Sequence, residues 1–131
     1  MSKHDISSAS DAADPPAEIE ASALARLDQD IGAEGLREVA QAALADNPNL
    51  CRELEQALAA RDAERLRMAA HTLKSTTRLL GASSLAELLG RIESGAAQGR
   101  LDAAAVTRAL RRHERFVVEL HAHPLMPPPP P

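Results

Sequence analysis

The chain has 131 residues, of which 44% are hydrophobic, with one phenylalanine and no tryptophan or tyrosine. Because β-sheets favour aromatic and β-branched residues, a hydrophobic set dominated by alanine and leucine argues against a sheet and predicts an all-α fold. The net charge of −4 argues against a nucleic-acid-binding protein, which needs a basic surface to replace phosphate counterions.

No apolar run is long enough to cross a membrane, and no secretory signal is visible at the start of the chain. The lone cysteine, Cys51, cannot form an internal disulfide, and its leucine-spaced surroundings favour a buried or half-buried thiol over a reactive one. These features predict a cytoplasmic protein with no membrane-inserted segment.

The two ends of the chain differ in composition from its middle. Residues 1–17 are rich in serine, alanine and aspartate and include a proline pair, and residues 124–131 end in a run of prolines. Both segments are predicted to be disordered tails, so the folded domain is predicted to cover residues 18–123.

In chain order, the first predicted helix is short and carries three apolar residues: Ile19, Leu24 and Leu27. A longer helix is predicted from about residue 33 to residue 46. Asn47 and Pro48 suit the N-cap and first position of a helix, so they predict a restart and a third helix to about residue 60.

Three more helices are predicted in the second half of the chain. The fourth starts near Asp62 and ends at Gly81, the fifth spans about residues 83–98, and the sixth opens at Asp102. Because short loops force successive helices antiparallel, we expect an up-down four-helix bundle with short additional N-terminal helices.

The fourth helix places a histidine on its polar face. With an advance of about 100° per residue, Leu66, Leu73 and Leu80 lie on the side opposite His71, which therefore points away from the core. Three cations and a small residue share its outward face, with two semi-exposed apolar residues beside them: Arg67, Lys74, Arg78 and Ser75, with Met68 and Leu79. An exposed imidazole among cations suits a negatively charged group such as phosphate.

The stretch from Ala70 to Glu93 resembles the histidine phosphotransfer (HPt) family. Its signature is His-x-Leu-Lys followed by a small residue, a glycine at the end of that helix, and a leucine-spaced helix that ends near a glutamate. The matching residues are His71, Leu73, Lys74, Gly81, Ala82, Leu85, Leu88 and Glu93. Ser75 stands where the family usually has glycine, and its small side chain still permits close approach by a partner.

The resemblance implies a monomeric phosphocarrier of a two-component phosphorelay, without catalytic activity, a cofactor or a metal of its own. His71 is expected to accept a phosphoryl group from an aspartate of one receiver domain and to pass it to another. Lys74 is expected to stabilise the phosphate charge, and Mg²⁺ is expected in the partner receiver. The expected docking surface comprises five residues: Arg67, Met68, Ser75, Arg78 and Leu79.

Other interpretations stay open. The chain could be a helical module that docks a receiver without being phosphorylated, or the phosphoacceptor domain of a chemotaxis-type kinase. It could also be free-standing or the C-terminal module of a hybrid sensor histidine kinase. No acidic residue lies at helical spacing from His71 to orient its ring, so we do not predict that Ser75 and His71 form a hydrolase.

The remaining histidines are weaker candidates for chemistry. His113 has the helical spacing of apolar residues and is predicted to be partly buried in the bundle. His121 and His123 could hold a metal, but two ligands near a chain end are weak evidence for a metal site.

Overall fold

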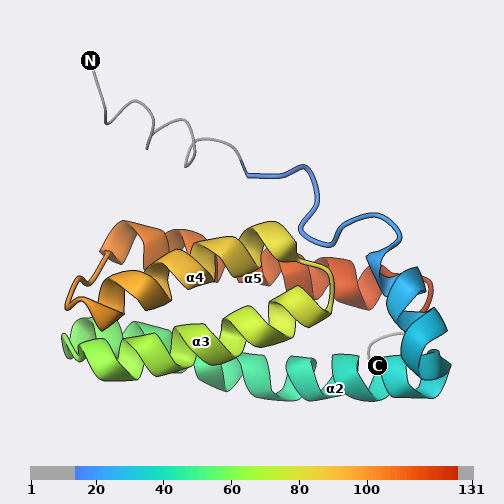
Figure 1. The fold of residues 1–131 in the computed structure, drawn as a ribbon, viewed down its shortest axis with the longest axis horizontal. Coiled ribbons are helices and arrows are strands. Elements are labelled where there is room, and N and C mark those ends of the chain that lie inside the picture. Colours follow the sequence, from blue (N-terminus) through green and yellow to red (C-terminus); the bar gives the residue numbers. More distant parts are fainter. Residues whose placement is uncertain (1–13, 127–131) are drawn as a thin grey trace.

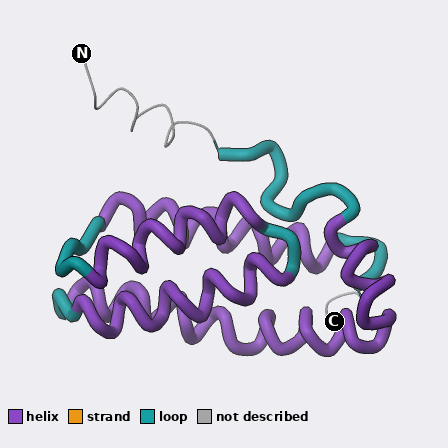
Figure 2. The backbone as a smooth tube through the Cα atoms, viewed as in Figure 1, coloured by secondary structure: helices purple, strands orange, loops and turns teal. Residues whose placement is uncertain are grey.

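The computed structural model describes residues 14–126, which form four helices joined by short turns (Figures 1 and 2). These are α2 (Ala23–Ala59), α3 (Ala63–Leu79), α4 (Ser83–Ala97) and α5 (Ala103–Ala122). Figure 1 shows successive helices running in opposite directions, which confirms the predicted all-α, up-down four-helix bundle. Over the described range, no helix is both long and apolar enough for a membrane span.

The predicted helix restart at Asn47 and Pro48 is wrong, because both residues lie inside α2. Asn47 does not cap a helix; it is 1% exposed and its side chain contacts His113 and Thr76. Proline inside a helix removes one backbone hydrogen bond and costs about 3 kcal/mol. Tertiary contacts along the buried face of α2 offset that cost and keep the helix continuous.

Gly32 marks the break that α2 does contain. Its φ of 83° and ψ of 164° are not helical, so the residues from Ala23 to Ile31 form a separate arm ahead of a kink. Within residues 14–126, this arm is the one short N-terminal helix found of those expected from the sequence. Ile19 precedes it and is 9% exposed.

The segment before α2 is fixed to α5 by buried charges. The Glu18 carboxylate, whose side chain is 0% exposed, accepts a hydrogen bond from Arg112 at 2.9 Å. Arg112 also donates to the Ser84 hydroxyl of α4 at 2.9 Å. In return, the Glu119 carboxylate accepts hydrogen bonds of 2.9 Å from the backbone N–H groups of Glu18 and Ile19. The entering chain is therefore part of the packed structure.

Contacts also occur just outside the expected domain limits of 18 and 123. Asp14 forms an ion pair with Arg108 at 2.8 Å, and Met126 is only 8% exposed. The tail predictions for residues 1–13 and 127–131 lie outside the described residues.

The core side of α3 is the one that the periodicity predicts. Leu66, Leu73 and Leu80 are at most 1% exposed. Ala70 and Thr77 are also buried, since α3 packs against both α2 and α4. Because α2 covers one side of α3 and α4 covers another, only a narrow strip of α3 is open to solvent. His71 lies on that strip.

Candidate functional site

Both ends of α3 are fixed by local interactions. At its start, the Asp62 side chain accepts a hydrogen bond from the backbone N–H of Arg65 at 3.1 Å. After its end, Gly81 has a φ of 86°, and a Cβ atom there would lie 2.3 Å from the Cβ of Ala23. Only glycine fits this turn, which holds α4 antiparallel to α3.

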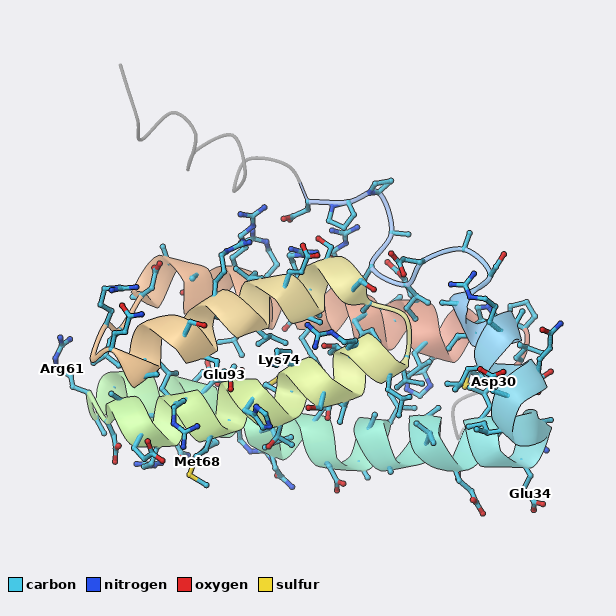
Figure 3. The ribbon with its side chains drawn as sticks, viewed as in Figure 1. Asp30, Glu34, Arg61, Met68, Lys74 and Glu93 are labelled. Atoms are coloured by element: carbon cyan, nitrogen blue, oxygen red, sulfur yellow. The ribbon has the colours of Figure 1, made fainter. Side chains whose placement is uncertain are left out.

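The His71 side chain is 57% exposed, and its Nδ1 atom lies 2.8 Å from Oε2 of Glu93 on α4. The other oxygen of that carboxylate, Oε1, lies 2.6 Å from Nζ of Lys74. Figure 3 places Lys74 and Glu93 in the seam between α3 and α4. One carboxylate therefore holds both the imidazole and the ammonium group.

Glu93 determines which nitrogen of His71 can react. The hydrogen bond from Lys74 lowers the pKa of the Glu93 carboxyl, partial burial opposes this, and the His71 contact lowers it further. The carboxylate is thus ionised at neutral pH and can only accept hydrogen bonds. In the neutral ring Nδ1 then carries the proton and donates it, and Nε2 keeps the free electron pair. Nε2 is therefore the ring nitrogen whose electron pair is available to a partner.

The sequence interpretation did not identify Glu93 as a site residue. Helical spacing relates His71 only to acids on its own helix, whereas this carboxylate comes from the next helix. His71 and Glu93 lie almost equally far from the Gly81 turn, one before it and one after it. In an antiparallel hairpin such residues lie side by side, so this symmetry and the glutamate of the family signature were the available signals.

Lys74 is not the free cation that the sequence suggests. Its side chain is 21% exposed and lies along α4, with its charge paired to Glu93. Arg67 is likewise paired, with Glu64 at 2.6 Å on its own helix. Arg78 is exposed and forms no ion pair with any side chain in residues 14–126. Arg78 is therefore the cation of this face that is open to a partner.

The other residues expected at the docking surface lie on the solvent side of α3. Met68 and Leu79 are 57% and 51% exposed, so each presents a large apolar side chain to solvent on this helix. Figure 3 shows Met68 on the flank of α3 away from α4. The Ser75 hydroxyl donates to the backbone oxygen of His71 at 3.2 Å, so it is occupied within the helix.

The remaining candidates have structural roles. His113 is 6% exposed, and its Nε2 atom lies 3.1 Å from Nδ2 of Asn47. His123 accepts a hydrogen bond from the backbone N–H of Leu125 at 3.2 Å. No group of three metal-ligating side chains occurs among residues 14–126. Burial raises the pKa of the Cys51 thiol to about 11, which keeps the thiol protonated and unreactive.

Comparison with known proteins decides the family. The Hpt domain family model matches residues 38–120, a span that contains His71, Lys74 and Glu93. The chain belongs to the Hpt domain family. It is a histidine phosphotransfer module of a phosphorelay, and its partners are receiver domains.

A solved structure supports the fold of this Hpt domain. The crystal structure of histidine-containing phosphotransfer protein B from Pseudomonas aeruginosa PAO1 is similar, with a TM-score of 0.73 and 24% sequence identity. The similarity covers 81% of this chain and 93% of that one. No curated protein matches the sequence.

Proposed function

We propose that His71 is the phosphoacceptor of this Hpt domain and that Nε2 is the atom phosphorylated. The contact of 2.8 Å between Nδ1 and Glu93 is the observation that carries this proposal. It fixes the ring tautomer and orientation without enclosing the ring, whose side chain is 57% exposed. An exposed, oriented nucleophile on a convex helix can enter the active site of another protein.

The reaction follows from this geometry. The Nε2 electron pair attacks the phosphorus of an aspartyl phosphate on one receiver, in line with the bond to the leaving oxygen. The Nε2–P bond forms, the P–O bond breaks, and the receiver regains its free carboxylate. The reverse step transfers the phosphoryl group to the aspartate of a second receiver. Glu93 offsets the positive charge that develops on the ring, and the Mg²⁺ for the reaction belongs to the receiver.

Lys74 contributes charge rather than a bond to the ring. Without it, the Glu93 carboxylate would repel the phosphoryl oxygens that arrive beside it. Because the Lys74 ammonium lies 2.6 Å from Glu93, it cancels that charge and stays one helical turn from His71. Its expected role in phosphate charge stabilisation therefore acts through the carboxylate that it shares with His71.

The proposed docking surface combines an apolar edge with one open cation. Met68 and Leu79 offer apolar contact area on one flank, and Arg78 offers a guanidinium group to an acidic or carbonyl partner. Ser75 has a small side chain beside His71, so the loops of a receiver can approach the imidazole without a steric clash. Arg67 completes the surface at the N-terminal end.

Hpt domains are phosphocarriers without catalytic activity, and we propose that this chain acts as a monomer in the cytoplasm. It is either free-standing or the C-terminal module of a hybrid sensor histidine kinase. In both arrangements the donor is a receiver aspartate, which distinguishes the proposal from a chemotaxis-type domain phosphorylated directly by an ATP-binding kinase domain.

The test is transfer of radiolabelled phosphate from a phosphorylated receiver to the purified protein. Wild-type protein should retain an acid-labile, base-stable label, and His71→Gln should retain none. Because the His71 side chain is largely exposed, the free energy of unfolding of this variant should lie within about 0.5 kcal/mol of the wild-type value. His121→Gln is the matched control and should accept label normally. Label retained on His71→Gln would refute the site, and binding without label on wild type would favour the docking-only alternative.

A second variant tests the observation that carries the proposal. Glu93→Gln keeps the shape of the side chain but removes the negative charge that fixes the Nδ1 proton. It should slow transfer about tenfold or more while the domain stays folded. A wild-type rate would mean that Glu93 does not orient the nucleophile.

A further inference from the structure

Gly90 is a glycine of α4 that lies against the Lys74 side chain. A Cβ atom at this position would lie 3.4 Å from Cδ of Lys74. Gly90 has no left-handed φ and lies in the interior of α4, so its backbone conformation is open to any residue. Glycine in a helix interior is less stable than alanine. Backbone conformation therefore does not explain the glycine at this position, and its contact with Lys74 is the feature that distinguishes it.

The path of the Lys74 side chain indicates that role. Gly90 and Glu93 are three residues apart on α4, so they lie on the same face, one turn from each other. The Lys74 stem passes over Gly90, and its ammonium group ends 2.6 Å from Glu93. The Lys74 side chain is only 21% exposed, because it lies flat on α4 instead of extending into solvent.

We infer that Gly90 is a positioning residue of the phosphotransfer site. Because position 90 has no side chain, the Lys74 side chain can lie against α4 there and reach Glu93. The inference rests on the proposed role of His71, since Glu93 is the carboxylate that orients that ring. A methyl group at position 90 still fits beside Cδ at van der Waals distance. A side chain with γ-carbons occupies the space of the lysine stem and forces the ammonium group away.

Displacement of Lys74 has a defined chemical consequence. Glu93 would keep its contact with His71 but lose the ammonium group that neutralises it. Its negative charge would then face the incoming phosphoryl group without compensation. The same loss removes the largest of the interactions that lower the pKa of the Glu93 carboxyl, so that pKa would rise.

The test compares Gly90→Val with Gly90→Ala in the full chain. Valine places two γ-carbons at the helix surface, whereas alanine adds only the Cβ atom that the site accommodates. Gly95→Val is the matched control for valine in α4, because a Cβ atom there lies near Arg100 and not near the site.

The first measurement is the titration of the Glu93 side-chain carboxyl carbon by NMR. Gly90→Val should shift the midpoint upward, to the value found in Lys74→Ala, whereas Gly90→Ala and Gly95→Val should titrate like wild type. This readout reports the position of Lys74 and does not depend on phosphotransfer. A wild-type midpoint in Gly90→Val would overturn the inference.

The second measurement is the rate of phosphoryl transfer in a double-mutant cycle. Gly90→Val should slow transfer by the same factor as Lys74→Ala, and the double variant should be no slower than either single variant. Additive losses would show that Gly90 acts independently of Lys74 and would overturn the inference.

Thermal melts keep the test informative if Gly90→Val folds poorly. A clash with the lysine stem is relieved when the stem is removed, so Lys74→Ala should raise the melting temperature of Gly90→Val but not of Gly95→Val. No rescue would show that valine destabilises α4 for a reason other than Lys74. If His71 is not the phosphoacceptor, the transfer arm fails in wild type while the titration and the melts still report on Gly90.

Discussion

The buried histidine of α5 predicts a loss of stability in mild acid. Nε2 of His113 lies 3.1 Å from Nδ2 of Asn47, an amide nitrogen that can only donate a hydrogen bond. Nε2 must therefore accept, and the ring is neutral in the folded protein. Protonation would turn two donors toward each other in a site where His113 is 6% exposed. Burial accordingly lowers the pKa of His113 from 6.5 to about 4.

The direction and size of the effect follow by linkage. The unfolded chain binds a proton at this histidine near pH 6.5, whereas the folded protein resists protonation until about pH 4. Stability is therefore complete above pH 6.5 and falls as the pH drops toward 4. At 1.36 kcal/mol for each unit of the difference between the two pKa values, the free energy of unfolding falls by about 3 kcal/mol over this window.

The assay is urea unfolding of wild type and His113→Gln at a series of pH values from roughly 7.5 to 4. This range covers the window of pH 6.5 to about 4 and extends about one unit above it. Glutamine offers Asn47 an acceptor and does not titrate. The cationic partners of Asp14 and Glu93 lower the pKa values of these carboxyl groups. Their contribution to the stability of the protein is therefore lost only at more acidic pH, and to the same extent in both proteins. The difference in slope between the two proteins therefore isolates the histidine. Parallel stability curves above pH 4.5, roughly the ordinary carboxyl range, would refute a buried neutral ring.

Three further perturbations test the assignment of the α3 faces. Leu73→Ala should destabilise the domain by about 2 to 5 kcal/mol by opening a cavity in the core, and a denaturation midpoint equal to wild type would mean that α3 is rotated. Lys74→Ala should slow transfer to His71 on the order of a hundredfold without unfolding the domain, and Lys74→Arg should retain more activity; equal rates for all three proteins in a label-transfer time course would remove Lys74 from the site. Ser75→Trp should abolish both receiver binding and transfer because the indole blocks approach to His71. Amide shifts in an NMR titration that cluster on α5, with Ser75→Trp binding normally, would place the interface elsewhere.

The sequence predicted the face of each helix better than the limits of the helices. Leucine spacing on α3 determined the direction of His71, because a helix in a bundle must bury its apolar stripe and the opposite strip is then exposed. Asn47 and Pro48 misled the prediction, since a local capping signal cannot show that Asn47 has partners on two other helices. The sequence separated a short first helix from a longer one starting at about residue 33, and the structure has its kink at Gly32, where glycine permits the positive φ.

The candidate site was predicted only in part, for a related reason. Residues that share a helix with His71 are related to it by fixed angles, so the strip of α3 could be derived from spacing alone. Glu93 and Gly90 lie on α4, and their position relative to His71 depends on the α3–α4 turn and on how deeply the two helices pack. Lys74 was assigned a free charge because the carboxylate that binds it was not placed.

The folded unit is larger than the region that the family shares. The family match begins at residue 38, yet the Glu18 carboxylate that neutralises Arg112 lies twenty residues ahead of that point. A fragment cut at the edge of the match would leave a guanidinium buried in the bundle without its anion, which typically costs about 3 to 5 kcal/mol. It would also delete Leu24 and Leu36, both at most 1% exposed, and so uncover the core side chains that pack against them. Homology therefore delimits the phosphotransfer chemistry, whereas the integrity of this domain depends on a segment outside that homology.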